Sequence, residues 1–253
     1  MTGLQLFDMH CHLDFAPDAR AAARGLAKRE AGAFSVTVEP SGFERSSALL
    51  AGCENMRVGL GLHPWWVAEG RCGEADVEAF ARLARATRFI GEVGLDFGKR
   101  CEGAREAQVA AFARVAEACV DGGRVLSVHA VRATADVLDA LAGAGALGGN
   151  AVVFHWFSGT SDELGRAVDA GCFFSLNPRM LASRRGRAYA RAIPEDRLLL
   201  ETDAPGQSGD PYDPAAEVAL LERMLDDLAD LRAVSRGRLA ARIAETGARL
   251  LDL

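Results

Sequence analysis

Two histidines separated by a single residue stand near the start of the chain, within the stretch FDMHCHLDF. In a β-strand, residues i and i+2 point to the same side, so His10 and His12 face one way and Cys11 faces the other. Two imidazoles directed at one point are suited to hold a metal ion. The alternative is a pair of histidines that only pack in the core or on the surface, and the pair by itself leaves both interpretations open.

The remaining histidines stand in the same kind of place. His63, His129 and His155 each close a short apolar run, and none of them falls in a predicted helix. Glu92 and Asp203 occupy equivalent positions in two further runs. Imidazoles and carboxylates that converge on one pocket need a positive charge between them, which a divalent cation supplies. Four histidines and two carboxylates are too many ligands for one ion and suit a site for two.

Eight β-rich runs carry these residues, and their continuous apolar character suits strands that are buried on both faces of a parallel sheet. The runs are LQLFDMH, AFSVTVE, RVGLGLH, RFIGEVGL, RVLSVH, NAVVFH, CFFSLN and RLLLETD. Between them lie stretches with helical spacing, for example 74–87, 104–121, 134–142 and 161–170. Pro17 and Pro214 stand where a helix could begin. From Asp213 onwards the chain predicts two amphipathic helices with a break near Ser235.

The polar residues that end these runs recur at intervals of 22 to 37 residues, without a Pro-, Gly- or Ser-rich linker. Eight β-then-α units in about 250 residues predict a (β/α)8 barrel of the α/β class, whose strand ends converge on one face. We therefore expect a single domain over residues 1–253. A doubly wound open sheet is the alternative, but its first βα turn would be glycine-rich, and HCHLDFAPDA is not.

Composition and charge limit the classes of function. The 253 residues, 49% of them hydrophobic, are enough to build a full core. A net charge of −6 and a pI of about 5.5 argue against binding of nucleic acid through a broadly basic surface, so such contacts must come from local arginines and bound cations.

The cysteines indicate a compartment. Six scattered cysteines without a CxxC pair exclude a zinc ribbon or a thioredoxin-type motif, and they predict reduced, mostly buried thiols in the cytoplasm. We expect no signal peptide, because the N-terminus lacks a basic stretch followed by an apolar region. We expect no membrane segment either, because no apolar run approaches about 18 residues.

Six sequence blocks, in order, resemble the motifs of the TatD family of metal-dependent hydrolases, a branch of the amidohydrolase superfamily. The blocks are DMHCHLD, GLHPWW, IGEVGLDF, SVHAVRA, VFHWFSG and IPEDRLLLETDAP, and they cover nearly the whole chain. The resemblance implies a (β/α)8-like barrel with two divalent cations, for which Mg²⁺, Mn²⁺ and Zn²⁺ are the candidates. The chain departs from the family pattern in HAVRA and in the loop GQSGDPYDPAAE, both of which face the substrate.

The resemblance also implies which residues hold each cation. The ligands of the first cation are His10, His12, Glu92 and Asp203. The ligands of the second cation are Glu92, His129 and His155. Many members of the superfamily bridge the cations with a carbamylated lysine at the end of the fourth strand. That position is Glu92 here, and neither Lys28 nor Lys99 ends a strand.

Asp203 and His63 are the candidate catalytic residues. Asp203 can ligate a cation and hold the attacking water as general base, and the resemblance places His63 against a substrate phosphate. The predicted reaction is hydrolysis of a phosphodiester, with DNA as the leading substrate, by a hydroxide that bridges the two cations. Hydrolysis of a carboxylic ester or amide, such as an aminoacyl ester, is the alternative. A non-catalytic metal-binding protein is a third possibility, and the retention of all six ligands argues against it.

Further residues are candidates for contact with the substrate. Trp65 and Trp66 follow His63 at the predicted mouth of the barrel, where they either stack on a base or form a packing lid. Arg184, in the run SRRGRAYAR, could guide a phosphate backbone, although an arginine-rich helix is usually a solvated face. Arg132 in HAVRA stands one position later than the arginine usual in the family. We expect Trp65, Arg132 and Arg184 to contact the substrate together with His63.

Three polar residues have undecided roles. Asp14 and Glu201 either orient metal ligands from behind or only cap and pair neighbouring groups. Asn177 either lines the pocket or satisfies the main chain.

Overall fold

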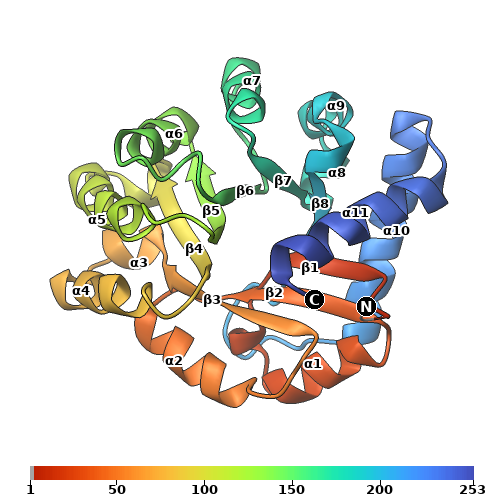
Figure 1. Cartoon of the computed structure of the whole chain (residues 1–253), viewed down its shortest axis with the longest axis horizontal. Coiled ribbons are helices and arrows are strands. Elements are labelled where there is room, and N and C mark those ends of the chain that lie inside the picture. The colour runs from red at the N-terminus through yellow and green to blue at the C-terminus, as the bar shows by residue number, and fades with distance from the viewer. Residues whose placement is uncertain (1–2) are drawn as a thin grey trace.

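The computed structural model describes residues 3–253, in which eight parallel strands form one sheet with the order of the sequence. Each strand is followed by at least one helix, and the helices surround the strands (Figure 1). The strands are β1 (Leu6–Cys11), β2 (Ala31–Val36), β3 (Met56–Leu62), β4 (Phe89–Asp96), β5 (Val125–Val131), β6 (Ala151–His155), β7 (Phe173–Leu176) and β8 (Leu198–Leu200). All eight predicted strands are present, and the predicted (β/α)8 barrel is confirmed.

The sheet closes next to the predicted site. The amide of Asp203 donates to the carbonyl of His10 at 2.9 Å, and the amide of His12 donates to the carbonyl of Ala204 at 2.9 Å. Both bonds lie beyond the end of β8, so the segment after this short strand completes the ring. Closure therefore brings the last predicted metal ligand beside the first two.

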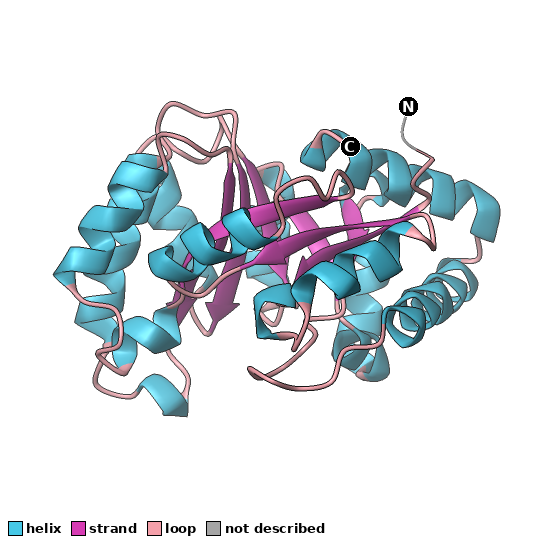
Figure 2. Ribbon diagram, turned by 90° about the horizontal axis from the view of Figure 1, so that it is seen from below, coloured by secondary structure: helices cyan, strands magenta, loops and turns pink. Residues whose placement is uncertain are grey.

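The described chain has eleven α-helices. In the view from below, helices lie on both sides of the strands (Figure 2). They are α1 (Ala19–Ala27), α2 (Pro40–Leu49), α3 (Pro64–Ala68), α4 (Glu74–Leu83), α5 (Arg105–Ala118), α6 (Thr134–Gly143), α7 (Ser161–Asp169), α8 (Pro178–Ala182), α9 (Arg184–Ala192), α10 (Pro214–Arg232) and α11 (Arg236–Leu251). Short 3-10 turns occupy Leu13–Phe15, Lys99–Cys101 and Glu195–Arg197. No helix among residues 3–253 has the length and apolar character that crossing a membrane requires.

Helix starts follow local capping chemistry. Pro214 is the first residue of α10, as predicted, and the Asp213 carboxylate accepts the amide of Ala215 at 2.9 Å. The expectation for Pro17 is wrong by two residues, because α1 begins at Ala19. Asp18 caps this helix instead, because its carboxylate accepts the hydrogen bond of the Ala21 amide in the first turn. A proline side chain cannot accept such a bond.

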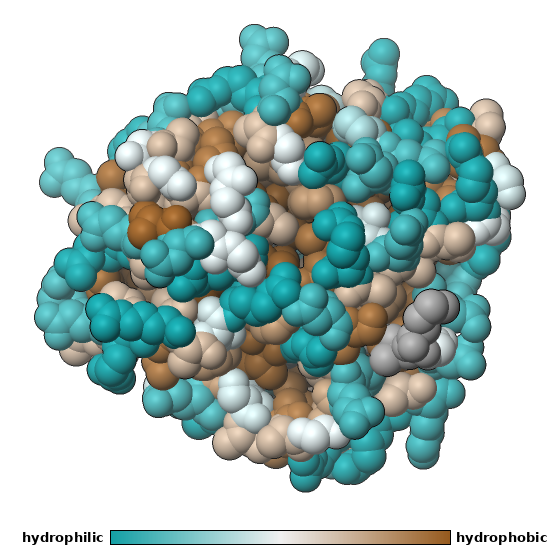
Figure 3. All heavy atoms as spheres, in the orientation of Figure 1, coloured by the Kyte–Doolittle hydropathy of each residue, from teal (hydrophilic) through white to brown (hydrophobic). Residues whose placement is uncertain are grey.

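The apolar core has two parts, one between the strands and the helices and one inside the barrel. The inner part contains Phe7 of β1, Phe34 of β2 and Phe173 of β7. Leu250 and Leu251 of α11 join them and close the end of the barrel at which strands begin. Figure 3 shows that hydrophilic side chains cover much of the face over which α11 lies, with apolar residues visible between them.

Two glycines let neighbouring strands approach closely at the level of the site. A Cβ on Gly61 would lie 1.7 Å from the carbonyl oxygen of Thr37, and a Cβ on Gly94 would lie 2.0 Å from the carbonyl oxygen of His129. Gly94 also has a φ of +143°, which residues with side chains rarely adopt. The backbone at His129 is thus seated directly against β4.

Candidate metal centre

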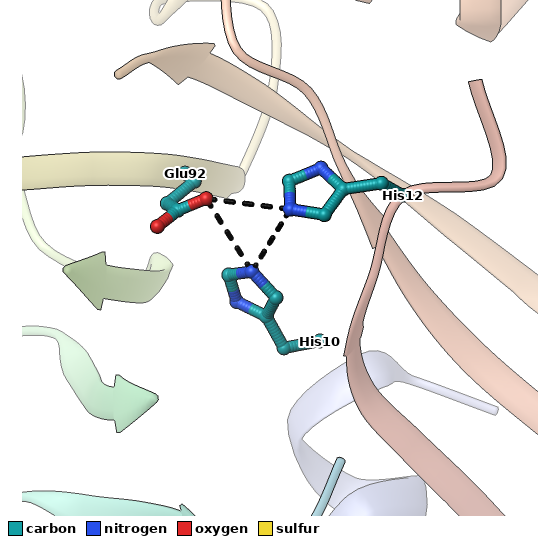
Figure 4. Close-up of side chains that lie close together, drawn as sticks. All are labelled: His10, His12 and Glu92. Atoms are coloured by element: carbon teal, nitrogen blue, oxygen red, sulfur yellow. Dashed lines mark hydrogen bonds and ion pairs between the residues drawn. The ribbon is translucent and has the colours of Figure 1, made fainter. Parts of the chain in front are cut away.

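All six predicted metal ligands meet at the end of the barrel where the strands finish. They are His10 in β1, His12 directly after it, Glu92 within β4, His129 in β5, His155 at the end of β6 and Asp203 after β8. Figure 4 shows His10 and His12 directed together at Glu92. Three groups drawn from these residues and His63 have ligand atoms within 4.8 Å of one another.

Glu92 lies at the centre of the cluster, and its two oxygens face different sets of imidazoles. Oε2 is 3.4 Å from Nε2 of both His10 and His12. Oε1 is 2.8 Å from Nδ1 of His129 and 2.9 Å from Nε2 of His155. A carboxylate placed in this way can give one oxygen to each of two cations.

Asp203 adds a second carboxylate to the side that holds the first two histidines. Its Oδ1 is 3.6 Å from Nε2 of His10 and 3.5 Å from Nε2 of His12. The side chain is 27% exposed, whereas those of Glu92 and His10 are 3% and 0% exposed, so Asp203 is the ligand with most access to solvent.

The environment keeps Asp203 ionised. Burial raises the pKa of the Asp203 carboxyl, but the hydrogen bond from His12 and the nearby imidazoles outweigh burial and lower the pKa to about 2. One expectation is corrected: Asp203 does not end the eighth strand, because β8 stops at Leu200. Asp203 has a φ of +61°, a left-handed conformation that leaves the ladder and that aspartate tolerates better than most residues.

Asp96 lies behind His129, and the sequence analysis did not single it out. Nε2 of His129 lies 3.0 Å from Oδ2 of Asp96, and because an ionised carboxylate can only accept, Nε2 carries a proton; Nδ1 faces Oε1 of Glu92 at 2.8 Å. Burial raises the pKa of Asp96, but hydrogen bonds from His129, the Trp65 indole and the Gly98 amide lower it to about 2. The signal was available, since Glu92 and Asp96 are four residues apart and share a face of one strand.

Two other histidines have partners behind them. Nδ1 of His10 is 2.7 Å from the hydroxyl oxygen of Ser127, a residue that the sequence did not single out. Nδ1 of His155 is 3.5 Å from Oε1 of Glu201, which is fully buried. Glu201 also accepts hydrogen bonds from the hydroxyl of Ser175 and, at 3.4 Å, from the side-chain amide Nδ2 of Asn177. Glu201 therefore lies behind a ligand, as one of the two alternatives had it.

The other undecided residues also find places. Asn177 caps α8 by accepting the amide of Arg179, and it lines the cavity as well. Asp14 lines the cavity, but its Oδ1 is buried without a hydrogen-bond partner in the described chain. The same is true of Nδ1 of His12. Cys11 is fully buried in the outer core, as its strand position predicts.

His63 lies inside the cluster, next to the central carboxylate. Its Nδ1 accepts the amide of Trp65 at 3.0 Å, so the ring proton is on Nε2, which is 3.1 Å from Oε1 of Glu92. An N–H cannot ligate a metal but can donate a hydrogen bond. Burial lowers the pKa of His63 to about 4, which keeps the imidazole neutral.

The donor set fits divalent cations. The Nε2 atoms of His10 and His12 face each other at 3.3 Å, as do Nε2 of His155 and Nδ1 of His129. Two such lone pairs repel unless a proton or a metal ion lies between them. Imidazole nitrogens and carboxylate oxygens are the ligands that Zn²⁺ and Mn²⁺ take, and a Mg²⁺ or Mn²⁺ site would use the oxygens more heavily.

The cluster forms the floor of a cavity of about 1740 Å³. Five basic side chains line this cavity: Arg45, Arg71, Lys99, Arg100 and Arg179. The predicted substrate residues His63 and Trp65 line it too, whereas Arg132 and Arg184 are exposed and are not among the lining residues.

Each tryptophan of the cavity has an arginine beside it. The guanidinium carbon of Arg100 lies 3.9 Å from the ring centroid of Trp65, and that of Arg71 lies 3.9 Å from the ring centroid of Trp66. A third pair joins Trp156 and Arg179 at 5.3 Å. Two of these arginines are held by Glu69, so their charge is partly balanced.

The chain is thus a (β/α)8 barrel protein with a candidate metal centre of imidazoles and carboxylates where its strands end. The family model described as TatD related DNase matches residues 7–252, and the chain belongs to this family.

Individual relatives support the same assignment. The chain is 30% identical over 221 residues to an uncharacterized metal-dependent hydrolase TatD from Mycobacterium tuberculosis, with 82% of each chain covered. It is 34% identical over 140 residues to a 3'-5' ssDNA/RNA exonuclease TatD from Edwardsiella piscicida, a match that covers 52% of this chain and about half (50%) of that protein. The fold superposes on the crystal structure of the TatD homologue YJJV from Escherichia coli with a TM-score of 0.77, 23% identity and full coverage of both chains.

Proposed function

We propose that the protein is a divalent-metal-dependent phosphodiesterase that acts on single-stranded DNA. The single observation that carries the proposal is the position of Glu92, whose two oxygens face two separate sets of imidazoles. This division supports two cations bridged by one carboxylate. The relatives named as exonucleases support a nucleic-acid substrate.

The proposed assignment of ligands follows the two sides of Glu92. His10, His12 and Asp203 would hold one cation with Oε2, and His129 and His155 would hold the other with Oε1. The bound cations would supply positive charge that polarises a phosphoryl oxygen and makes water more acidic. The metal can be Mg²⁺, Mn²⁺ or Zn²⁺, and the experiment below includes all three.

The side chains around this charge have separate tasks. Asp203, ionised and open to the cavity, would accept the proton of the attacking water. His63 would donate its Nε2–H to a phosphate oxygen, because its neutral tautomer is fixed by the Trp65 amide. The buried ring of ligands would keep these groups in position before substrate arrives.

The residues of the cavity rim are suited to bind a nucleic-acid strand, although the net charge of the protein is −6. Arg179 and Lys99 line the cavity, and neither makes an ion pair within residues 3–253, so their charges are available to phosphates. Trp156 beside Arg179 offers an aromatic face, and alternation of cations with aromatic rings is typical of single-strand binding.

A panel of substrates with added metal tests the proposal. Protein stripped with a chelator is incubated with Mg²⁺, Mn²⁺ or Zn²⁺ and offered single-stranded DNA, a simple phosphodiester and carboxylic ester or amide substrates. We expect metal-dependent cleavage of DNA and of the phosphodiester. Turnover of only the carboxylic ester or amide substrates would show that the site hydrolyses those bonds and not phosphodiesters. Metal binding without turnover of any substrate would support the non-catalytic alternative.

The cytoplasmic location and the single-domain organisation over 1–253 also stay proposals. The location rests on the six cysteines, all of which are free thiols and five of which are buried. Fractionation of the producing cells with a compartment marker tests it, and recovery of the protein outside the cytoplasmic fraction would contradict it.

A further inference from the structure

The indole N–H of Trp65 bonds to a carboxylate that also contacts one of the candidate metal ligands. Nε1 of Trp65 donates to Oδ2 of Asp96 at 2.6 Å, and the same oxygen accepts Nε2–H of His129 at 3.0 Å. The side chains of Asp96 and His129 are only 5% and 8% exposed. The three groups form a continuous chain from the α3 segment to the central carboxylate.

Asp96 is fixed on its other sides as well. Its Oδ1 accepts the amide of Gly98 at 2.7 Å. Its own amide donates to Oε1 of Gln108 at 2.7 Å, and its carbonyl accepts Nε2–H of Gln108 at 2.9 Å. The main chain of Asp96 is thus clamped by α5, and the remaining freedom of the carboxylate is removed by the Trp65 indole.

One face of the Trp65 ring is covered by an arginine and is not open to stack with a base. The guanidinium of Arg100 lies over the ring at 3.9 Å and is itself bound by Glu69 at 2.7 and 3.0 Å. The edge with the N–H is turned inward to Asp96. The geometry therefore points to a role for Trp65 that does not require contact with substrate.

We propose that Trp65 is a positioning residue of the metal centre: its indole N–H holds Asp96 against Nε2–H of His129, and so keeps Nδ1 of His129 directed at Glu92. The proposal rests on the metal site proposed above. Groups that orient a ligating histidine from behind contribute about 10- to 100-fold to metal affinity.

The neighbouring tryptophan provides a matched control. Trp66 also carries an arginine at 3.9 Å from its ring centroid and also lines the cavity. Its Nε1, however, is buried without a hydrogen-bond partner in residues 3–253. Trp65→Phe and Trp66→Phe each remove an indole N–H and part of a ring, but only the first removes a bond to Asp96. The amide that fixes the His63 tautomer belongs to the main chain and stays in both variants.

Binding of Mn²⁺ to the chelator-stripped proteins, followed through the free ion by electron paramagnetic resonance, tests the inference. We expect Trp65→Phe to weaken one binding step by about 10-fold or more and to leave the other within about 2-fold. Trp66→Phe should bind like the wild type. Thermal unfolding of the metal-free variants checks that both are folded.

A double-mutant cycle with Asp96→Asn sharpens the test. Because Trp65 acts through Asp96, Trp65→Phe should weaken Mn²⁺ binding much less in the Asp96→Asn background than in the wild type. Wild-type affinity in Trp65→Phe, an equal loss in Trp66→Phe, or additive losses in the cycle would each overturn the inference. A wild-type protein that binds no Mn²⁺, Mg²⁺ or Zn²⁺ would instead overturn the proposed function, so the two failures are distinguishable.

Discussion

At the scale of single residues, Asp203 differs from the other ligands in its access to the cavity. Asp203→Asn keeps the shape and an oxygen ligand but removes the charge and the base. We expect near-native folding, at least one metal ion still bound, and a kcat lower by roughly 10²-fold or more, the usual scale of general-base catalysis. Measurement of kcat beside metal content checks this. A variant that keeps more than about a tenth of the wild-type kcat would show that another group takes the proton.

His63 and Glu92 contact each other, but their proposed roles differ: His63 donates a hydrogen bond to the substrate, whereas Glu92 binds metal. His63→Ala should keep the bound metal and lose turnover, because Nε2–H is a donor and not a ligand. Glu92→Ala should lose metal, because both sets of imidazoles face its oxygens. Metal analysis of the two variants, side by side with kcat, separates the roles. An empty site in His63→Ala would make His63 a ligand.

The convergence of the six candidate ligands could be predicted from the sequence, because alternation in a strand and the meeting of strand ends fix the direction of these side chains. His10 and His12 follow from a spacing of two, and Glu92 from its place in the fourth run. The tautomer of His63 could not be predicted, because it depends on one amide of the α3 turn. The contact of Ser127 with His10 could not be predicted either, because a serine within an apolar strand does not indicate which side chain it contacts.

At the scale of elements, the segment after β7 places on the cavity wall a different arginine from the one that the sequence predicted. The arginine run predicts Arg184, but α9 begins at Arg184 and carries it away from the cavity, whereas α8 begins at Pro178 and leaves Arg179 on the cavity wall. The difference arises from a break at Ser183, which caps α9 with its hydroxyl and ends α8. A helix of five residues lies below what periodicity can detect.

Substitution of these two arginines decides between them. Arg179→Ala should raise KM for single-stranded DNA by roughly 10-fold, the scale of one lost hydrogen bond to a charged group, with kcat little changed. Arg184→Ala is the matched control and should stay within about 2-fold. The opposite pattern would return the substrate contact to Arg184, as the sequence predicted.

The pairing of β4 with β5 depends on the absence of one side chain. Gly94→Ala adds a Cβ that would lie 2.0 Å from the His129 carbonyl oxygen, at a φ of +143°. Backbone strain alone costs roughly 1–3 kcal/mol, and the shift of β5 should also weaken metal binding. Urea unfolding and Mn²⁺ binding measure the two effects.

Gly165→Ala in α7 is the control for that substitution. A Cβ there meets nothing within 4 Å, so the free energy of unfolding should rise by about 0.5–1 kcal/mol from helix propensity, with metal binding unchanged. A Gly94→Ala variant as stable as the wild type would show that the two strands can separate without cost.

At the scale of the whole molecule, the two ends of the barrel have different compositions. The end where strands begin is filled by aromatic and aliphatic side chains and covered by α11, while the other end collects the titratable residues. The arrangement concentrates buried charge where a cation can balance it. The sequence predicted the polar end, because all five histidines lie at the ends of the predicted strands, and in a barrel these ends converge on one face.

Linkage between protons, metal and folding gives a prediction for the whole molecule. Burial lowers the pKa of His12, but hydrogen bonds and charges from Asp203 and Glu92 prevail and raise the pKa to about 10 in the metal-free fold. A histidine with a raised pKa contributes stability that is complete below its ordinary pKa of 6.5 and is lost as the pH rises through about 10. The pKa of His155 and that of His129 are raised as well, so they act in the same direction.

A bound cation takes the place of those protons, so the metal-loaded protein should not show this loss. We expect the Tm of the metal-free protein to fall between pH 6.5 and about 10 more steeply than that of the loaded protein, and loading at neutral pH to release protons into a weak buffer. Buried thiols with a raised pKa, such as Cys11, also destabilise the fold at high pH, but they do so in both forms and cancel in the difference. Thermal unfolding of both forms across this range, with proton release followed by an indicator dye, makes the measurement. Parallel Tm curves together with no proton release would mean that His12 is already neutral in the metal-free fold.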